Sequence, residues 1–304
     1  MRRNRLRVLL TAAILALTLL LSSLWLPQGG GAGGGAGCGS PWHPCLTFHR
    51  HKPESNLEAA QWEESGQNPA FRECPGQSFQ SSVLLRHLGA CLSEEGDVLM
   101  EPYLQSWDQL ILFMESLGTM VGFFSHKVKD KVALIRQLSI KPSAGEDHGK
   151  LGPNPEARGL TQGVYRSVRS MVEAELEQGL VGFTFRTESG CRTLLRLHRS
   201  MLWVKLVLQG LTEGPDQNGA YKTPGEIGRE AYSVALAPHH SWFLQSAAEL
   251  VLAALPDRKY FLQLVCVSSQ SEAAPALRVV IRALTRVHER TNEILERHTL
   301  LLLP

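Results

Sequence analysis

Apolar residues recur at intervals of three and four from Ser78 almost to the end of the chain. This spacing places them on one face of an α-helix. No segment alternates convincingly between apolar and polar residues, as a half-buried strand would. Pro102 suits the first turn of a helix, and Gly118 suits the end of the same helix. The sequence therefore predicts an all-α domain over residues 78–304.

About eight helices are expected, joined by short to moderate loops. A chain of 304 residues that is 43% hydrophobic and 20% charged can bury one sizeable core, so we expect one main domain. No internal repeat indicates a solenoid. The expected helices are residues 101–118, a segment capped by Ser125 and continuing to Leu138, and residues 165–180, 192–211, 226–237, 241–255, 257–266 and 272–298.

The N-terminus differs from the rest of the chain. Four arginines within the first seven residues precede an uncharged, mostly apolar run over residues 8–26. At about 1.5 Å per residue this run can cross a bilayer core, which needs roughly 17 to 25 residues. The basic flank would keep the N-terminus cytosolic and send the following chain across the membrane. We therefore predict that residues 1–27 are a signal anchor or a cleaved signal peptide, with a lumenal, extracellular or secreted main domain rather than a cytosolic one.

Residues 28–77 combine a Gly/Ala tract with five prolines and little helical periodicity. Such a composition predicts a disordered linker. A GxGxxG match inside the tract follows no strand and precedes no helix, so low complexity explains it better than dinucleotide binding does. Cys38 and Cys45 could close a small loop in an oxidising compartment, and their spacing does not resemble that of metal ligands.

Several functions are disfavoured by the sequence. The formal charge is only +2, and basic residues are interspersed with acidic ones, which argues against a nucleic-acid partner. The HExxH, GxSxG and Walker motifs are absent, so we expect no enzymatic activity, no catalytic residue, no cofactor and no metal site. We expect a monomer.

Three clusters of polar residues are candidates for a binding site. The stretch ESGCRTLLRLHR places Arg192, Arg196 and Arg199 at i, i+4 and i+7, on one face of a leucine-rich helix. Lys127 and Lys131 are also four residues apart, and His240 stands in a histidine pair just before a tryptophan. From spacing alone, the lysines also fit a solvated helix face, and the histidine also fits an ordinary packed residue.

Three longer motifs resemble those of the glycolipid transfer protein family, and within it the branch of ceramide-1-phosphate transfer proteins. They are LMEPYLQSWDQLILFMESLG, SGCRTLLRLHRSMLW with LQGL downstream, and AYSVALAPHHSW, and they occur in the order typical of the family. The likeness runs from about Phe79 to Pro304. It implies a two-layer helical sandwich that holds the hydrocarbon of one sphingolipid between its layers and the headgroup in a polar surface cleft.

The same resemblance implies roles for individual residues. Arg192, Arg196 and Lys131 match the residues that meet the lipid phosphate, and His240 matches the histidine that donates to the ceramide amide carbonyl. The sugar-binding branch has a tryptophan at the position of Arg196, whereas an arginine fork suits phosphate oxygens. The implied function is therefore transfer between membranes of a sphingolipid with a phosphate headgroup, such as ceramide 1-phosphate, with the membrane surface as the second partner.

One residue departs from the pattern of the family. Lys127 occupies the position of an aspartate that accepts hydrogen bonds from the ceramide amide and headgroup, and a lysine offers donors only. Asp130 lies about 4.5 Å further along the helix axis, close enough to pair with Lys127 or to replace the missing acceptor. An alternative function therefore stays open, that of a lipid sensor or membrane-tethered scaffold that does not transfer lipid.

Overall fold

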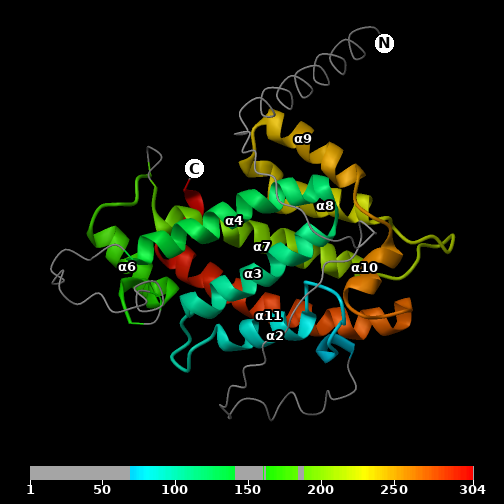
Figure 1. The fold of residues 1–304 in the computed structure, drawn as a ribbon. Helices are drawn as coiled ribbons and strands as arrows, with labels where there is room; N and C mark the ends of the chain where they lie inside the picture. The colour runs from blue at the N-terminus through cyan, green and yellow to red at the C-terminus, as the bar shows by residue number, and fades with distance from the viewer. Residues whose placement is uncertain (1–68, 141–159, 161, 184–187, 304) are drawn as a thin grey trace, which may run out of the picture. The chain divides into compact units, whose positions relative to one another are not determined.

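The computed structural model describes residues 69–140, 160, 162–183 and 188–303. These residues form nine α-helices with short 3₁₀ turns and no β-strand, which confirms the all-α prediction (Figure 1). Two isolated bridges, Leu92 to Val98 and Leu99 to Ser167, are the extent of extended pairing in this part of the chain.

Each predicted helix coincides with an observed one, and α2 is an additional helix. The bounds are α2 Ser81–Ala90, α3 Met100–Ser116, α4 Thr119–Ile140, α6 Val168–Glu177, α7 Gly190–Thr212, α8 Pro224–Ala235, α9 Trp242–Ala253, α10 Arg258–Leu264 and α11 Gln270–Arg297.

The prediction that Ser125 caps a helix is wrong. The break between α3 and α4 falls at Gly118, whose φ of 108° is accessible to glycine at little cost, and α4 begins directly after it. Ser125 is buried inside α4, and its hydroxyl donates to the carbonyl of Gly122 at 2.7 Å. A serine can bond in this way within a helix, so its presence did not mark a start.

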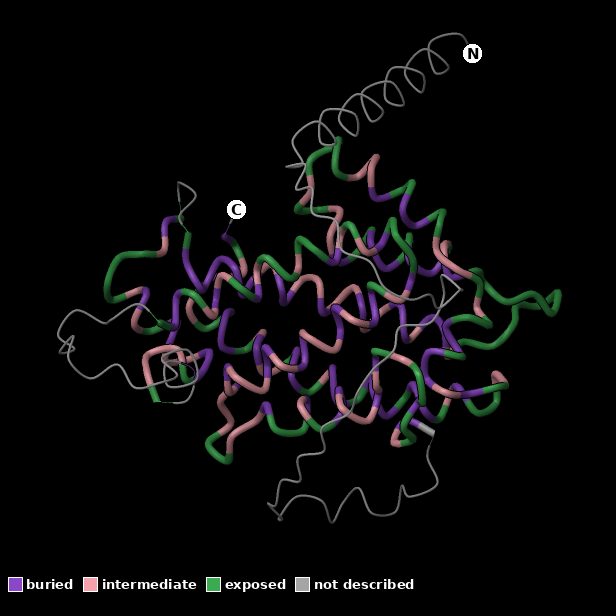
Figure 2. Tube along the Cα trace, viewed as in Figure 1, coloured by how far each residue is buried: buried purple, intermediate pink, exposed green. Residues whose placement is uncertain are grey.

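The helices form two layers. In one layer α3 lies between α2 and α4, and in the other α7 lies between α11 and α8. The layers meet where α4 packs on α7 and where α2 packs on α11. Figure 2 shows that the buried positions lie on the sides of the helices that face the interior. This arrangement confirms the two-layer sandwich, and its core includes Tyr103 and Trp107, which are fully buried on α3.

The packed domain begins before the predicted boundary at residue 78. The turn Pro69–Phe71 packs against α11, and Cys74 is fully buried and forms a disulfide with Cys266, which precedes α11. Residues 69–77 are therefore part of the domain, because burial and a covalent bond fix them to it. The predicted signal segment and the possible Cys38 to Cys45 pair lie outside the described residues. None of the described helices is long and apolar enough to cross a membrane.

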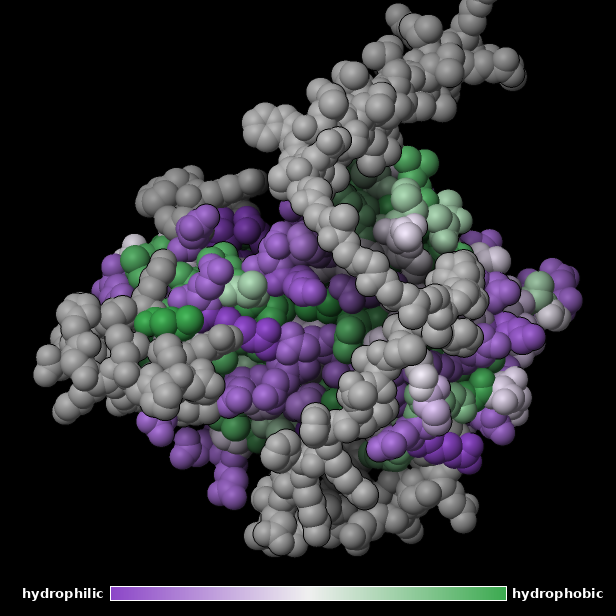
Figure 3. Space-filling model, viewed as in Figure 1, coloured by the Kyte–Doolittle hydropathy of each residue, from purple (hydrophilic) through white to green (hydrophobic). Residues whose placement is uncertain are grey.

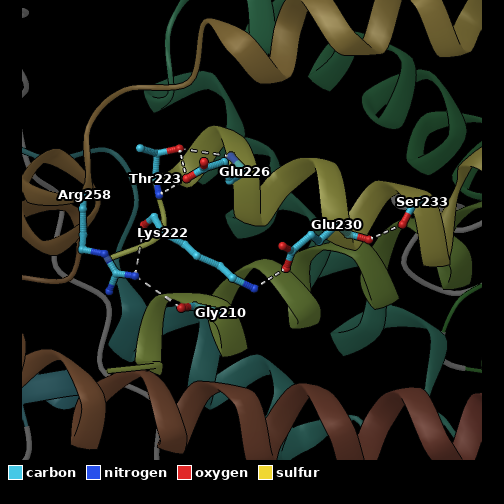
Figure 4. Close-up of polar contacts among 7 residues, drawn as sticks. All are labelled: Gly210, Lys222, Thr223, Glu226, Glu230, Ser233 and Arg258. Carbon is cyan, nitrogen blue, oxygen red and sulfur yellow. Dashed lines mark hydrogen bonds and ion pairs between the residues drawn. The ribbon is translucent and has the colours of Figure 1, made fainter. Parts of the chain in front are cut away.

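The C-terminal end of α7 is held by Arg258 at the start of α10. Its guanidinium donates to the carbonyl of Leu211 at 2.8 Å. It also donates to the carbonyls of Gly210 and Lys222 at 3.4 Å (Figure 4). Lys222 in turn pairs with Glu230 on α8 at 2.7 Å. These contacts satisfy carbonyls that a helix end leaves open. A cavity of about 410 Å³ lies beside them, at the far end of α7 from the predicted binding residues.

Two histidines stack in the core where α7 meets α11. The rings of His198 and His288 lie 4.0 Å apart and within 12° of parallel, and the residues are only 4% and 8% exposed. His198 Nε2 lies 3.1 Å from the side-chain oxygen of Asn292 and donates to it. Burial lowers the pKa of His198 to about 4, and burial together with the nearby His198 lowers that of His288 to about 3.

We predict that reduction destabilises the fold through loss of the Cys74 to Cys266 disulfide. The bond joins residues 192 positions apart, so it limits the unfolded chain strongly and contributes about 5 kcal/mol in a chain-entropy estimate. Denaturant unfolding of the wild type with and without reductant measures this difference. Cys266→Ser is the control and should respond little to reductant; an equally unresponsive wild type would contradict the prediction.

We also predict that acid destabilises the domain through the histidine pair. Both folded pKa values lie below the ordinary histidine value of 6.5, so the unfolded chain binds more protons than the folded one as the pH falls below about 6.5. Between about pH 7.5 and pH 5, each ring should lower the unfolding free energy by about 2 kcal/mol. His288→Leu should remove roughly half of this loss, whereas His126→Leu, at an exposed position, should leave it unchanged. If the unfolding free energy of both variants falls equally with pH, the loss does not come from the histidine pair.

Candidate functional site

The N-terminal end of α7 rests on a buried carboxylate. Glu175 is 2% exposed, and its oxygens accept hydrogen bonds from the backbone N–H groups of Gly190 at 2.6 Å and Cys191 at 2.9 Å. The hydroxyl of Tyr165 donates to the same carboxylate. Ser189 caps the helix by accepting from the N–H of Arg192 at 3.2 Å. Negative charge is favourable at a helix N-terminus, so Glu175 and Ser189 fix where α7 begins.

Gly190 leaves room for this contact. A Cβ added there would lie 2.6 Å from the sulfur of Met171 and 2.9 Å from a carboxylate oxygen of Glu175. Both distances are shorter than real Cβ atoms show, so with a larger residue the side chains of Met171 and Glu175 would have to shift. The glycine thus lets the first turn of α7 approach closely.

Arg192 and Arg196 lie one turn apart on α7. Arg192 is 2% exposed, and its Nη2 donates to the carbonyl of Gly182 at 2.5 Å. Arg196 is half-buried. Since residues four apart share a helix face, the two guanidinium groups project from the same side of α7, as the sequence predicts.

Lys131 on α4 lies in the field of Arg196. The pKa of Lys131 is lowered, first because its ammonium is withdrawn from water, and then because Arg196 and Lys127 are nearby; Asp130 opposes them. The Nζ of Lys131 donates to the backbone carbonyl of Lys127 at 2.9 Å. The structure therefore brings together two cations that the sequence places on separate helices.

His240 joins the cluster from the segment between α8 and α9. Its Nδ1 lies 2.8 Å from the hydroxyl of Tyr232. The pKa of His240 is lowered, first by burial and then by His239, Lys131 and Arg199. A neutral ring that accepts from Tyr232 at Nδ1 carries its proton on Nε2 and can donate it to a ligand.

The third arginine of the stripe has a different partner. Nη2 of Arg199 donates to the carbonyls of Leu301 at 3.1 Å and Leu303 at 3.2 Å. It therefore fastens the C-terminal turn Leu300–Leu302 to α7. Its charge still contributes to the lowered pKa of His240.

Lys127 and Asp130 are both exposed on α4, with 63% and 52% of their side chains open to solvent. The ammonium of Lys127 lies 3.5 Å from one oxygen of Asp130, and His126 lies 3.8 Å from the other. The expected salt bridge is thus present. The carboxylate of Asp130 is directed toward these two neighbours.

Two contributors to this site were missed by sequence reasoning. Tyr232 stands in the motif AYSVALAPHHSW, eight residues before His240, so its position was visible although its hydrogen bond was not. Glu175 gave no signal, because an isolated glutamate on an amphipathic helix normally faces solvent.

Comparison with known proteins identifies the family. Residues 98–267 match the family model of glycolipid transfer protein (GLTP). The human ceramide-1-phosphate transfer protein is 32% identical over 229 residues, which is 74% of this chain and 97% of the human protein. The Xenopus laevis protein of the same name is 34% identical over 232 residues, 75% of this chain and 98% of the relative. The chain belongs to the glycolipid transfer protein family.

Solved structures of the glycolipid transfer protein family share the fold. The human ceramide-1-phosphate transfer protein in complex with 12:0 ceramide-1-phosphate superimposes with a TM-score of 0.62 at 32% identity, covering 73% of this chain and 98% of that one. The apo form of the mouse protein gives a TM-score of 0.60 at 31% identity over the same shares. The described helices therefore have the arrangement typical of this family.

We predict that Glu175→Gln loosens the first turn of α7. The amide cannot reproduce the charge-assisted hydrogen bonds from Gly190 and Cys191, so the unfolding free energy should fall by about 2 kcal/mol. Hydrogen exchange of these two amides should accelerate. Glu177→Gln, on an exposed position of α6, serves as the control and should leave both measurements unchanged. Unaltered exchange in Glu175→Gln would show that the carboxylate does not hold the helix.

Proposed function

We propose that this protein binds a sphingolipid with a phosphate headgroup, such as ceramide 1-phosphate, and moves it between membranes without a chemical step. The observation that carries the proposal is the convergence of Arg196, Lys131 and His240 from three separate elements. Arg192 adds a fourth basic group one turn along α7. We assign these four residues to the headgroup.

A phosphate suits this cluster for electrostatic reasons. Cations that depress one another's pKa gain most from an anion placed among them, since it replaces repulsion by attraction. Partial burial strengthens the attraction by lowering the local dielectric constant. Entry of a phosphate should therefore raise the pKa of Lys131 back toward its ordinary value.

The hydrocarbon part of the lipid needs shelter from water during transfer. Each methylene group exposed to water costs about 0.8 kcal/mol, so a free sphingolipid does not leave a bilayer readily. The apolar interior between the α2, α3, α4 layer and the α7, α11 layer is the natural place for the chains. Burial of chains discriminates little between lipids, so selection must reside in the headgroup cluster.

The surface of α9 is suited to membrane contact. Figure 3 shows hydrophobic side chains gathered over this helix. Trp242 is 69% exposed, and Phe243, Leu244 and Leu250 are also exposed. Because α9 starts two residues after His240, a membrane bound by this helix would lie next to the headgroup cluster.

The family comparison supports the same ligand class. The human relative was crystallised with 12:0 ceramide-1-phosphate, and the members of this family are lipid transfer proteins rather than enzymes.

We further propose that the domain works in the lumen or outside the cell, as a single-pass membrane protein or after signal cleavage. The supporting observations are the apolar run of residues 8–26 with its arginine flank and the Cys74 to Cys266 disulfide. Disulfides persist mainly in oxidising compartments.

A second candidate function is a sensor or tethered scaffold that binds lipid without transferring it. Lys127, which stands where the family has an aspartate, favours this candidate, because it adds a like charge one turn from Lys131. Transfer and mere binding are separated by measuring both with the same protein.

We predict that Arg196→Leu weakens binding of ceramide 1-phosphate about thirtyfold, which corresponds to about 2 kcal/mol for one charged contact. The measurement is uptake and vesicle-to-vesicle transfer of a fluorescent ceramide 1-phosphate by the full-length protein. Arg282→Leu removes the same charge from an exposed position on α11 and should have no effect.

Three outcomes separate the functions. Equal binding by the two variants would refute the headgroup assignment. Binding of the lipid by the wild type without transfer would favour the sensor. The carrier function is supported if the wild type and Arg282→Leu bind and transfer the lipid and Arg196→Leu does neither.

A further inference from the structure

The described side chains of the headgroup cluster are nearly all hydrogen-bond donors. Lysine and arginine carry N–H groups and no acceptor, so Lys127, Lys131 and Arg196 can only donate. They come from α4 and α7, and they act on one another electrostatically. A ligand group that itself donates a hydrogen bond finds no complement among these three.

His240 also faces the ligand as a donor. The phenol of Tyr232 is buried, and His240 Nδ1 is its hydrogen-bond partner at 2.8 Å in the described part of the chain. A buried phenol must donate its proton, so Nδ1 accepts and the ring proton stands on Nε2. The neighbouring cations disfavour a charged ring, which keeps this arrangement in place.

Asp130 is a carboxylate of the described residues that acts on Lys131, and both of its oxygens lie near other side chains of α4. One is 3.5 Å from the ammonium of Lys127, and the other is 3.8 Å from His126. A ligand donor would have to compete with the ammonium of Lys127 for the nearer of these oxygens, so Asp130 does not replace the acceptor that Lys127 lacks.

This chemistry distinguishes two kinds of phosphorylated lipid. A ceramide phosphate carries an amide N–H and a hydroxyl close to the phosphate, and both need acceptors when water is removed. A diacylglycerol phosphate carries two ester carbonyls at the same distance, and these only accept. A ceramide phosphate whose N–H is buried without an acceptor loses binding free energy. The ester carbonyls of a diacylglycerol phosphate find N–H donors in the site, so their burial does not carry this cost.

We infer that the headgroup site takes the phosphate monoester of a diacylglycerol about as well as that of a ceramide, because Lys131, Arg196 and His240, together with the neighbouring Lys127, offer donors to both and an acceptor to neither. This inference rests on the proposed function, since it concerns the ligand class of the same site. Lys127 is the residue that sets the preference, through the acceptor that it does not provide.

The experiment compares lipids of matched chain length in binding to the full-length protein. The protein is first loaded with a fluorescent ceramide 1-phosphate. Phosphatidylcholine vesicles that contain a ceramide phosphate, a diacylglycerol phosphate or no added lipid are then tested for displacement of this probe. The affinities of the two phosphate lipids, measured by displacement of the probe, should differ by less than about threefold. A difference in binding free energy of about 1.4 kcal/mol would instead make them differ tenfold. Phosphatidylcholine alone should displace little.

The matched variants are Lys127→Asp and Lys129→Asp. Both exchange an exposed lysine of α4 for a carboxylate, so they change the net charge equally. Lys127→Asp restores an acceptor beside Lys131 and should shift the preference toward the ceramide phosphate about tenfold, the effect of one hydrogen bond to a charged group. Lys129→Asp should leave the ratio of the two affinities as in the wild type.

Each result decides between the inference and the function on which it rests. If the wild type binds the ceramide phosphate and excludes the diacylglycerol phosphate, the inference is overturned and the proposed function stands. If the wild type binds neither lipid, the proposed function itself fails. If Lys127→Asp and Lys129→Asp show the same ratio of affinities for the two phosphate lipids, the inference that Lys127 sets the preference is overturned.

Discussion

The site depends on one buried ionic contact, that between Glu175 and the first turn of α7. A carboxylate that is almost inaccessible to water receives two backbone N–H groups and a phenol, so its charge is fully solvated by the protein. Without this contact the first turn of α7, which carries Arg192, would have no fixed position relative to α6. Gly190 leaves room for the contact, since a Cβ there would come too close to the side chains of Met171 and Glu175. Arg192 and Arg196, which we propose to bind the headgroup, are therefore positioned by residues outside the proposed site.

Positive charge dominates one turn further along α7, where Arg196 lies near Lys131. Burial and the charge of Arg196 lower the pKa of Lys131, and burial, His239 and Lys131 lower that of His240, so positive charge on both side chains is held at an electrostatic cost. The rest of the fold bears that cost, through the packing of α4 on α7 and the fastening of the C-terminal turn by Arg199. An anion removes the repulsion. Ligand binding should therefore stabilise the fold at the same place where it is least favourable without ligand.

The sequence predicted most of the helices because their apolar faces are long and regular. The helix expected at residues 192–211 is observed as Gly190–Thr212, and its extra residues follow from the capping by Ser189 and Glu175. Ser125 misled the prediction because a serine also fits inside a helix. The predicted linker extended too far toward the C-terminus, because a local sequence pattern does not show that Cys74 bonds to a residue 192 positions away. Periodicity likewise could not bring Lys131, Arg196 and His240 together; only the family resemblance did.

Ligand choice in such a protein can change with little effect on the fold. Lys127 is exposed, and its ion pair with Asp130 is too long and too hydrated to matter for stability. A substitution at this position therefore costs little, whereas changes at Glu175 or Gly190 alter the core. Two requirements are separated on the surface of α4: its buried side packs against α3 and α7, and its exposed side carries Lys127, which we propose to face the ligand. Selection among lipids can then vary at the rim while the sandwich that shelters the hydrocarbon stays the same.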